Sequence, residues 1–154
     1  MATSAVPATI DALIAALRNA DGLDGVRVID GPPGVNFTEK DRIYIGHSPG
    51  ADQATEMQQS FASAGARTRD EDGTIACYIE SRRGDTDIRA RRQRVFEILA
   101  VVENALRATN QRPDAPTLGG TVLWSDLTAG ALLQVQENGT LAGLSFTVHF
   151  RARI

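Results

Sequence analysis

The segment from Thr86 to Thr109 constrains the fold of this chain more than any other. Its apolar residues recur at the spacing of one helical face, which predicts a long amphipathic helix. At 1.5 Å per residue such a helix is roughly 35 Å long, enough to span a domain of this size. The remaining elements must therefore pack along one face of this helix. The residues of the expected stripe are Ile88, Val95, Leu99, Val102 and Leu106.

Most other segments have the two-residue alternation of strands. These segments are "VRVID", "DRIYIG", "GTIACYIES" and the closing pair "GTVLWSDLTAGALLQVQ" and "LSFTVHFRARI". Asn138-Gly139 between the last two predicts a hairpin turn. The stretch from Thr55 to Ala62 is interpreted as an exposed strand.

A shorter helix is expected near the N-terminus, with Thr9 as its cap and Asp11 in its first turn. Its apolar face consists of Ile10, Leu13, Ile14 and Leu17.

This order of elements favours an α+β fold, a mainly antiparallel β-sheet packed against one long helix and a shorter N-terminal helix. Strands and helices do not alternate strictly, as they do in a parallel sheet. We expect residues 1–154 to form one domain, because 154 residues supply one well-formed core.

Composition narrows the possible partners. The formal net charge of −3 argues against a general nucleic-acid binder. No apolar run approaches the roughly 20 residues of a membrane span, so no membrane partner is expected. Cys77 is the only cysteine and has no partner for an internal disulfide, which favours folding in a reducing cytoplasm.

The sequence predicts no enzyme, no catalytic residue, no metal and no cofactor. His47 and His149 are about a hundred residues apart, and neither is placed with a nucleophile. Cys77 alternates with Ile75 and Ile79 on one strand face, which is typical of a small buried residue. A zinc site would require several cysteine or histidine ligands.

Six arginines precede or open the long helix, whereas three acidic residues lie upstream of the strand "GTIACYIES". The arginines admit three interpretations: contact with an acidic surface of a neighbouring subunit, contact with nucleic-acid phosphates, or pairing and solvation within the helix itself. The basic set is Arg82, Arg83, Arg89, Arg91, Arg92 and Arg94, and the acidic set is Asp70, Glu71 and Asp72.

The layout of the chain resembles the tail terminator proteins of long-tailed, siphovirus-like phages, particularly those of actinobacterial hosts and their prophages. The phrases "VIDGPP", "RRGDTDI" and "VHFRARI" carry the resemblance, together with the order "IDALIAALRNADGLDG", "RIYIG" and "LGGTVLWSDL". The family implies an α+β subunit of a hexameric ring that ends tail-tube polymerisation and offers the tail to the head connector.

The resemblance also implies partners and a location. The partners are further copies of the chain, the major tail tube protein and head–tail connector proteins. DNA passes through the lumen without sequence recognition. The location is the tail–neck region of a virion assembled in the cytoplasm of the host bacterium.

A closed ring needs a head-to-tail contact between different surfaces of neighbouring subunits. We expect Asp70, Glu71 and Asp72 of one subunit to face the arginines of the next, in particular Arg82, Arg83, Arg89, Arg91 and Arg92. Met57 and Phe61 are expected to contact the tail tube or a neighbour. They lie in the long polar tract from His47 to Asp72, which is either mobile until it binds or a hairpin on its own domain.

Two other functions stay open. The first is a different phage neck component, such as a head-completion or connector protein. The second is a small ligand-binding module, for which the sequence shows no convergent polar cluster.

Overall fold

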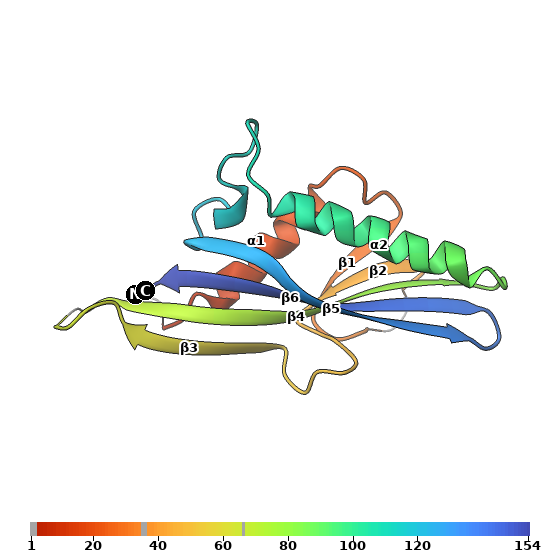
Figure 1. Cartoon of the computed structure of the whole chain (residues 1–154), viewed down its shortest axis with the longest axis horizontal. Helices are drawn as coiled ribbons and strands as arrows, with labels where there is room; N and C mark the ends of the chain where they lie inside the picture. Colours follow the sequence, from red (N-terminus) through yellow and green to blue (C-terminus); the bar gives the residue numbers. More distant parts are fainter. Residues whose placement is uncertain (1–2, 35–36, 66) are drawn as a thin grey trace.

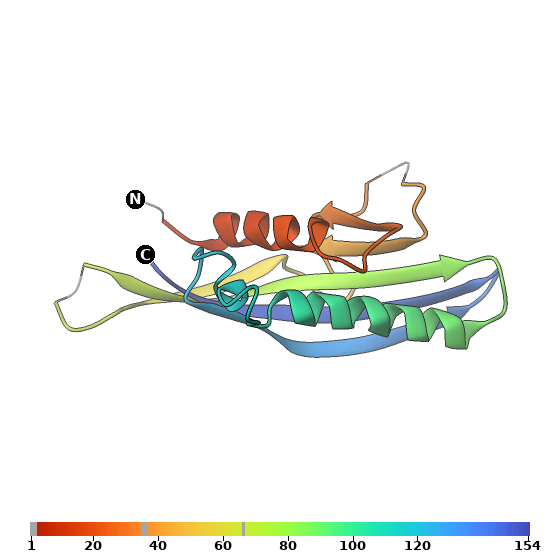
Figure 2. The same cartoon turned by 90° about the horizontal axis from the view of Figure 1, so that it is seen from above.

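The chain folds into a long six-stranded sheet with two α-helices on one face (Figures 1 and 2). This computed structural model describes residues 3–34, 37–65 and 67–154. In chain order the elements are α1 (Val6–Arg18), β1 (Val26–Asp30), β2 (Asp41–Ile45), β3 (Thr55–Phe61), β4 (Arg69–Arg83), α2 (Ile88–Ala105), a 3-10 helix η1 (Ala115–Thr117), β5 (Trp124–Gln136) and β6 (Thr140–Arg153).

The strand order across the sheet is β1-β2-β4-β6-β5, with β3 pairing beside β2 on the same side of β4. Among the described strands, β1 and β2 pair in parallel, whereas the other four strand pairs are antiparallel. The predicted α+β class with a mainly antiparallel sheet is therefore confirmed. The centre of the sheet is the ladder between β4 and β6, which runs from Asp70–Arg153 to Arg83–Thr140.

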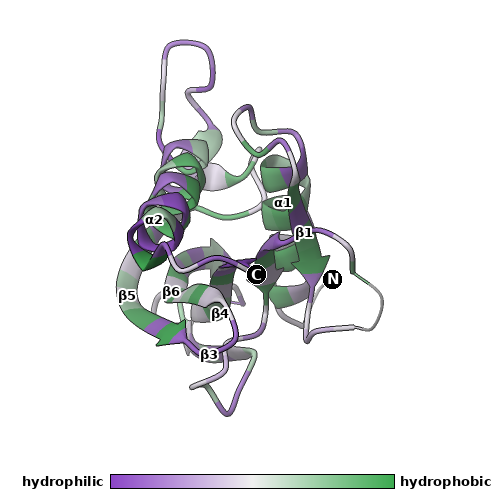
Figure 3. Cartoon of the chain, turned by 90° about the vertical axis from the view of Figure 1, so that its right-hand side faces the viewer, coloured by the Kyte–Doolittle hydropathy of each residue, from purple (hydrophilic) through white to green (hydrophobic). Residues whose placement is uncertain are grey.

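The main core lies between the sheet and the two helices, which cover the same face (Figure 3). Ile75, Cys77 and Ile79 point into it from β4, as their alternation predicted. The helix α2 contributes Val95, Ile98 and Val102, all fully buried. Leu99, which was expected in this stripe, is only half-buried, and Ile98 takes its place.

The helix α1 begins earlier than predicted. Pro7 lies in its first turn, where a missing N–H costs nothing and the ring already holds a helical φ. Thr9 is therefore inside the helix, is fully buried and donates its hydroxyl to the Ala5 carbonyl at 2.6 Å. The prediction of Thr9 as the cap is wrong, and Asp11 lies beyond the first turn.

The helix α2 is shorter than the predicted segment Thr86–Thr109. The side chain of Asp87 caps it by accepting the Ala90 amide at 3.1 Å. Conversely, β4 is longer than predicted, because it includes the acidic residues at its start and Arg82 and Arg83 at its end. The sequence pattern predicted the acidic residues upstream of this strand, and Arg82 and Arg83 between this strand and the long helix.

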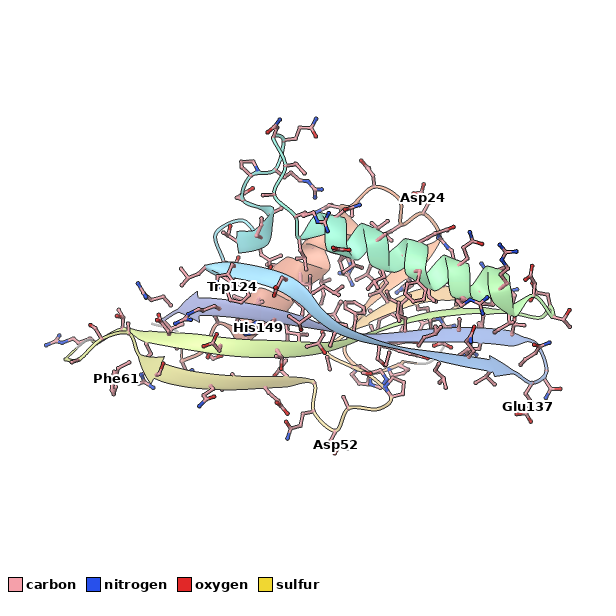
Figure 4. The ribbon with its side chains drawn as sticks, in the orientation of Figure 1. Asp24, Asp52, Phe61, Trp124, Glu137 and His149 are labelled. Atoms are coloured by element: carbon pink, nitrogen blue, oxygen red, sulfur yellow. The ribbon has the colours of Figure 1, made fainter. Side chains whose placement is uncertain are left out.

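The predicted turn at Asn138-Gly139 is confirmed, and both residues have positive φ angles of 54° and 119°. This turn lies at one end of the long axis, beside Glu137, whereas the end of β3 with Phe61 lies at the other (Figure 4). On the face of the sheet away from the helices, a small cluster of Ile29, Tyr44 and Tyr78 with Phe37 covers the β1–β2 end.

Candidate assembly surface

The two charged sets predicted from the sequence lie at opposite ends of one strand. Asp70, Glu71 and Asp72 are at the start of β4, and Arg82 and Arg83 are at its end. Twelve residues from Glu71 to Arg83 correspond to roughly 40 Å of extended strand. The sets therefore do not meet within a subunit, and a contact between them in copies that run in the same direction requires these copies to be offset along their strands.

The first acidic residue has basic partners in its own subunit. Asp70 accepts hydrogen bonds from Arg153 Nε at 2.8 Å and from Arg151 Nη2 at 3.3 Å, both on the adjacent strand β6. The hydrogen bond from Arg153 lowers the pKa of Asp70, against a smaller opposing effect of desolvation. These contacts leave Asp70 little capacity for a second subunit.

Glu71 is fully buried and holds the N-terminal segment against the sheet. Its carboxylate accepts the Ala5 amide at 2.9 Å, the Ser4 hydroxyl at 3.0 Å and the Gln59 amide at 2.6 Å. Because Ala5 is the residue before α1, this carboxylate also satisfies one of the free amides at the helix start. The third acidic residue, Asp72, stays half-exposed and lies 3.6 Å from His149 Nε2.

The basic end is organised around a buried carboxylate that the sequence did not single out. Asp41, at the start of β2, accepts Ser81 Oγ at 2.6 Å, Arg83 Nη1 at 3.0 Å and Arg94 Nε at 3.2 Å. Burial raises the pKa of Asp41, but the hydrogen bonds from Arg83, Ser81 and Arg94 outweigh it and hold the pKa below 3.8. Arg91 extends the cluster by donating to Ser81 Oγ at 3.3 Å.

The remaining predicted arginines are more accessible. Arg82 pairs with Glu80, and Arg92 donates from α2 to the Gln134 side chain of β5 at 2.8 Å. Arg89 is exposed on the first turn of α2. Most of the positive charge at this end is therefore bound within the subunit, and Arg89 and Arg92 are the members best placed to meet another chain.

Met57 and Phe61 lie on β3, which confirms the predicted strand between Thr55 and Ala62. The strand is the outer partner of β4, so the structure has the hairpin that the sequence left as an alternative. Met57 is 54% exposed and Phe61 70% exposed. The guanidinium of Arg69 lies 6.0 Å from the ring centre of Phe61, and Ser4 Oγ lies 3.1 Å from Met57 Sδ.

Sequence reasoning missed a second group of exposed apolar residues, on and beside β5. Leu132, Leu133 and Val135 are 38 to 52% exposed, and Phe96 of α2 lies one turn after Arg92, which contacts this strand. Figure 3 shows hydrophobic residues on β5 at the rim of the sheet. The signal in the sequence was the ten-residue run "LTAGALLQVQ", which has no charge to protect a sheet edge.

The histidines and the cysteine do not converge. His47 packs edge-on to Tyr44, with ring centres 5.5 Å apart, whereas His149 packs edge-on to Trp124 at 4.8 Å. Cys77 is fully buried, and this burial raises the pKa of its thiol to about 12. Among residues 3–34, 37–65 and 67–154, no three His, Cys, Asp or Glu side chains gather as a metal site.

Hydropathy identifies no membrane-crossing helix in the described part of the chain.

No protein-family model and no curated protein sequence matches this chain. Among solved structures, it is similar to a chain of the "Virion of native gene transfer agent (GTA) particle", with a TM-score of 0.60 and 12% sequence identity. The alignment covers 99% of this chain and 100% of that chain. At this identity the similarity shows a common fold, and it shows that fold over the full length of both chains.

Proposed function

We propose that this chain is a structural subunit of a phage-like virion, and specifically a tail terminator. The observation that carries the proposal is the fold shared over its whole length with a chain of a gene transfer agent virion. The phage-like phrases of the sequence support the same role. We assign it no catalytic activity.

In this proposal six copies form a ring at the head-proximal end of the tail tube. The ring ends polymerisation of the major tail tube protein and presents a surface to the head–tail connector, and DNA passes through its lumen without sequence recognition. Assembly takes place in the cytoplasm of a host bacterium, which we propose to be actinobacterial. Met57 and Phe61 supply exposed apolar contacts to the tube or to a neighbouring copy.

The proposed charged contact between copies is strongest for the residues with free capacity. Asp72 is half-exposed, Arg89 is exposed, and the side-chain partner of Arg92 in the described part of its own subunit is the neutral Gln134. Each exposed pair contributes about 0–1 kcal/mol. The charges therefore select the register of neighbouring copies, and the main attraction must come from other surfaces.

Electron microscopy tests the proposal with tubes of the cognate major tail tube protein, imaged with and without this chain. We expect ring-shaped density at one end of each tube and shorter tubes when the chain is present during polymerisation. Tubes that grow to the same lengths with bare ends would contradict a terminator role. Binding to isolated connector complexes, without binding to tubes, would instead indicate another neck protein.

A further inference from the structure

The large apolar side chains that the subunit exposes are concentrated at two of the three edge strands of its sheet, β3 and β5; the third edge strand, β1, carries none of them. Met57 and Phe61 are on β3, which within the described ranges pairs with β4 alone. On the opposite side, β5 pairs with β6 alone among the described residues and carries Trp124, Leu132, Leu133 and Val135. Leu123 precedes β5, and Phe96 lies on α2 one turn after Arg92, which contacts β5. Within the described residues these eight are all the large apolar side chains that are exposed.

Both edges carry little of the usual protection against pairing with another chain. Exposed edge strands normally carry charges, prolines or bulges that block addition of a further strand. From Leu127 to Gln136 β5 has no charged residue and no proline, and β3 has one charge, Glu56. The single bulge of β5 lies between Leu127 and Ala129, so the run from Ala129 to Gln136 is regular.

We propose that β3 of one copy pairs with β5 of the next copy, so that the sheet continues from subunit to subunit. This inference rests on the proposed ring and names its contact. Each copy offers one edge of each kind, which gives a head-to-tail interface, the type that closes into a ring.

The direction and register of the pairing follow from the topology. Along β3-β4-β6-β5 each strand is antiparallel to the previous one, so β5 of one copy and β3 of the next run antiparallel when the sheet continues unflipped. On the helix-covered face lie the odd-numbered residues of β3 and, after the bulge, the even-numbered residues of β5. In a continuing sheet, residues directly opposite each other share a face.

Only one register puts directly opposite residues on the same face and also pairs all seven residues of β3 with the regular run of β5, Ala129 to Gln136. It sets Thr55 opposite Gln136, Gln58 opposite Leu133 and Phe61 opposite Gly130. A shift of two residues in either direction reaches the bulge or the turn at Asn138. Phe61 then lies across a glycine, as Phe150 lies across its directly paired Gly73 within the subunit.

This register offsets neighbouring copies along their strands. Gln58 is level with Asp72 of β4, whereas Leu133 is level, through Gly143, with Glu80. The difference of about eight residues corresponds to roughly 26 Å, so the strands must be inclined to the ring axis. In copies that run in the same direction, the acidic start of β4 in one copy can reach the basic end of β4 in the next only when the two copies are offset.

Disulfide trapping between singly substituted copies tests the interface. Cys77 is fully buried, so an introduced exposed cysteine is the reactive one. We expect a disulfide-linked dimer when Gln58→Cys protein is mixed with Leu133→Cys protein under mild oxidation. The second pair, Met57→Cys with Gln134→Cys, covers the alternate type of position in an antiparallel ladder. Gln58→Cys with Gln136→Cys is the matched control, because these residues lie on opposite faces.

Three outcomes overturn the proposal. The first is a dimer from Leu133→Cys protein alone, which indicates pairing of β5 with β5 across a twofold axis. The others are rings in which neither disulfide forms and a chain that stays monomeric. Capped tubes without the disulfides would leave the terminator role intact and remove this interface. Disulfides that form while the tubes stay uncapped would support this interface and remove the terminator role.

A charge substitution gives a second readout. Gln58→Lys places a lysine at the proposed contact and should lower the assembled fraction at least severalfold, while Gln93→Lys on the exposed surface of α2 should not. Circular dichroism of both variants verifies that the subunit is folded. Equal assembly of the two variants would contradict the pairing.

Discussion

At the scale of single residues, Asp41 joins three elements at the basic end of the molecule. Its carboxylate links the start of β2 to Ser81 and Arg83 of β4 and to Arg94 of α2. The carboxylate is mostly buried, so removal of its charge would leave these donors without their acceptor.

The lowered pKa of Asp41 predicts how stability depends on pH. A carboxylate with a folded-state pKa below 3.8 stabilises the fold above that value, and this stabilisation is lost as the pH falls through the folded pKa. We expect Asp41→Asn to lower the free energy of unfolding at pH 7 and to flatten its decrease below pH 4. Urea unfolding between pH 7 and pH 3 measures both effects, and an unchanged acid profile would contradict the role of Asp41. Asp114→Asn, at an exposed site, is the control.

The Asp41 cluster also shows the limit of prediction from sequence at this scale. Arg83 and Arg94 are 42 and 53 residues from Asp41 along the chain. The local pattern showed that arginines gather here, but their partner is brought in by the sheet topology. The acidic residues are similar, because Arg151 and Arg153 reach Asp70 from more than 80 residues away.

At the scale of elements, the ladder between β4 and β6 includes a tight aromatic–glycine pair. Gly73 faces Phe150 directly, and an added Cβ at Gly73 would lie 2.3 Å from the ring. Phe150 is fully buried in the core, so its ring has little room to move. The absence of a side chain at position 73 therefore shapes the packing of both strands.

We expect Gly73→Ala to lower the free energy of unfolding by about 1–3 kcal/mol, the range for overpacked cores. Gly84→Ala is the matched control, because nothing lies within 4 Å of a Cβ added there. Denaturant unfolding of the two variants gives the comparison. Similar midpoints would show that the Phe150 ring adjusts without cost.

Periodicity in the sequence was sufficient to predict both helices, the strands and the closing hairpin. Periodicity did not predict where β4 and α1 begin, because charged residues and a typical capping residue suggested other boundaries. Asp70, Glu71 and Asp72 have the composition of a loop, yet contacts from β6, β3 and the N-terminal segment place them in β4. Thr9 is a good capping residue by type, but Pro7 moves the helix start forward.

At the scale of the whole molecule, the exposed edges predict a change in hydrogen exchange on assembly. One edge of β3 is bonded to β4, so alternate amides from Thr55 to Phe61 point outward and should exchange rapidly in the isolated subunit. We expect these amides, and those of Ala129 to Gln136 that point away from β6, to become protected in the ring. Unchanged exchange in both strands after assembly would contradict sheet continuation.

The long ladder between β4 and β6 also has a kinetic consequence. Its paired residues are as many as 83 positions apart in the sequence, whereas β5 and β6 meet through a three-residue turn. Closing the longer loop costs more conformational entropy before any pairing is gained. We expect the C-terminal hairpin to form early and the docking of β4 onto it to limit refolding, on a scale of roughly milliseconds to seconds. Until β4 docks, the side of β6 that faces away from β5 has no paired strand. The protein concentration during refolding then decides whether β4 of the same chain or a strand of another chain pairs with β6 first.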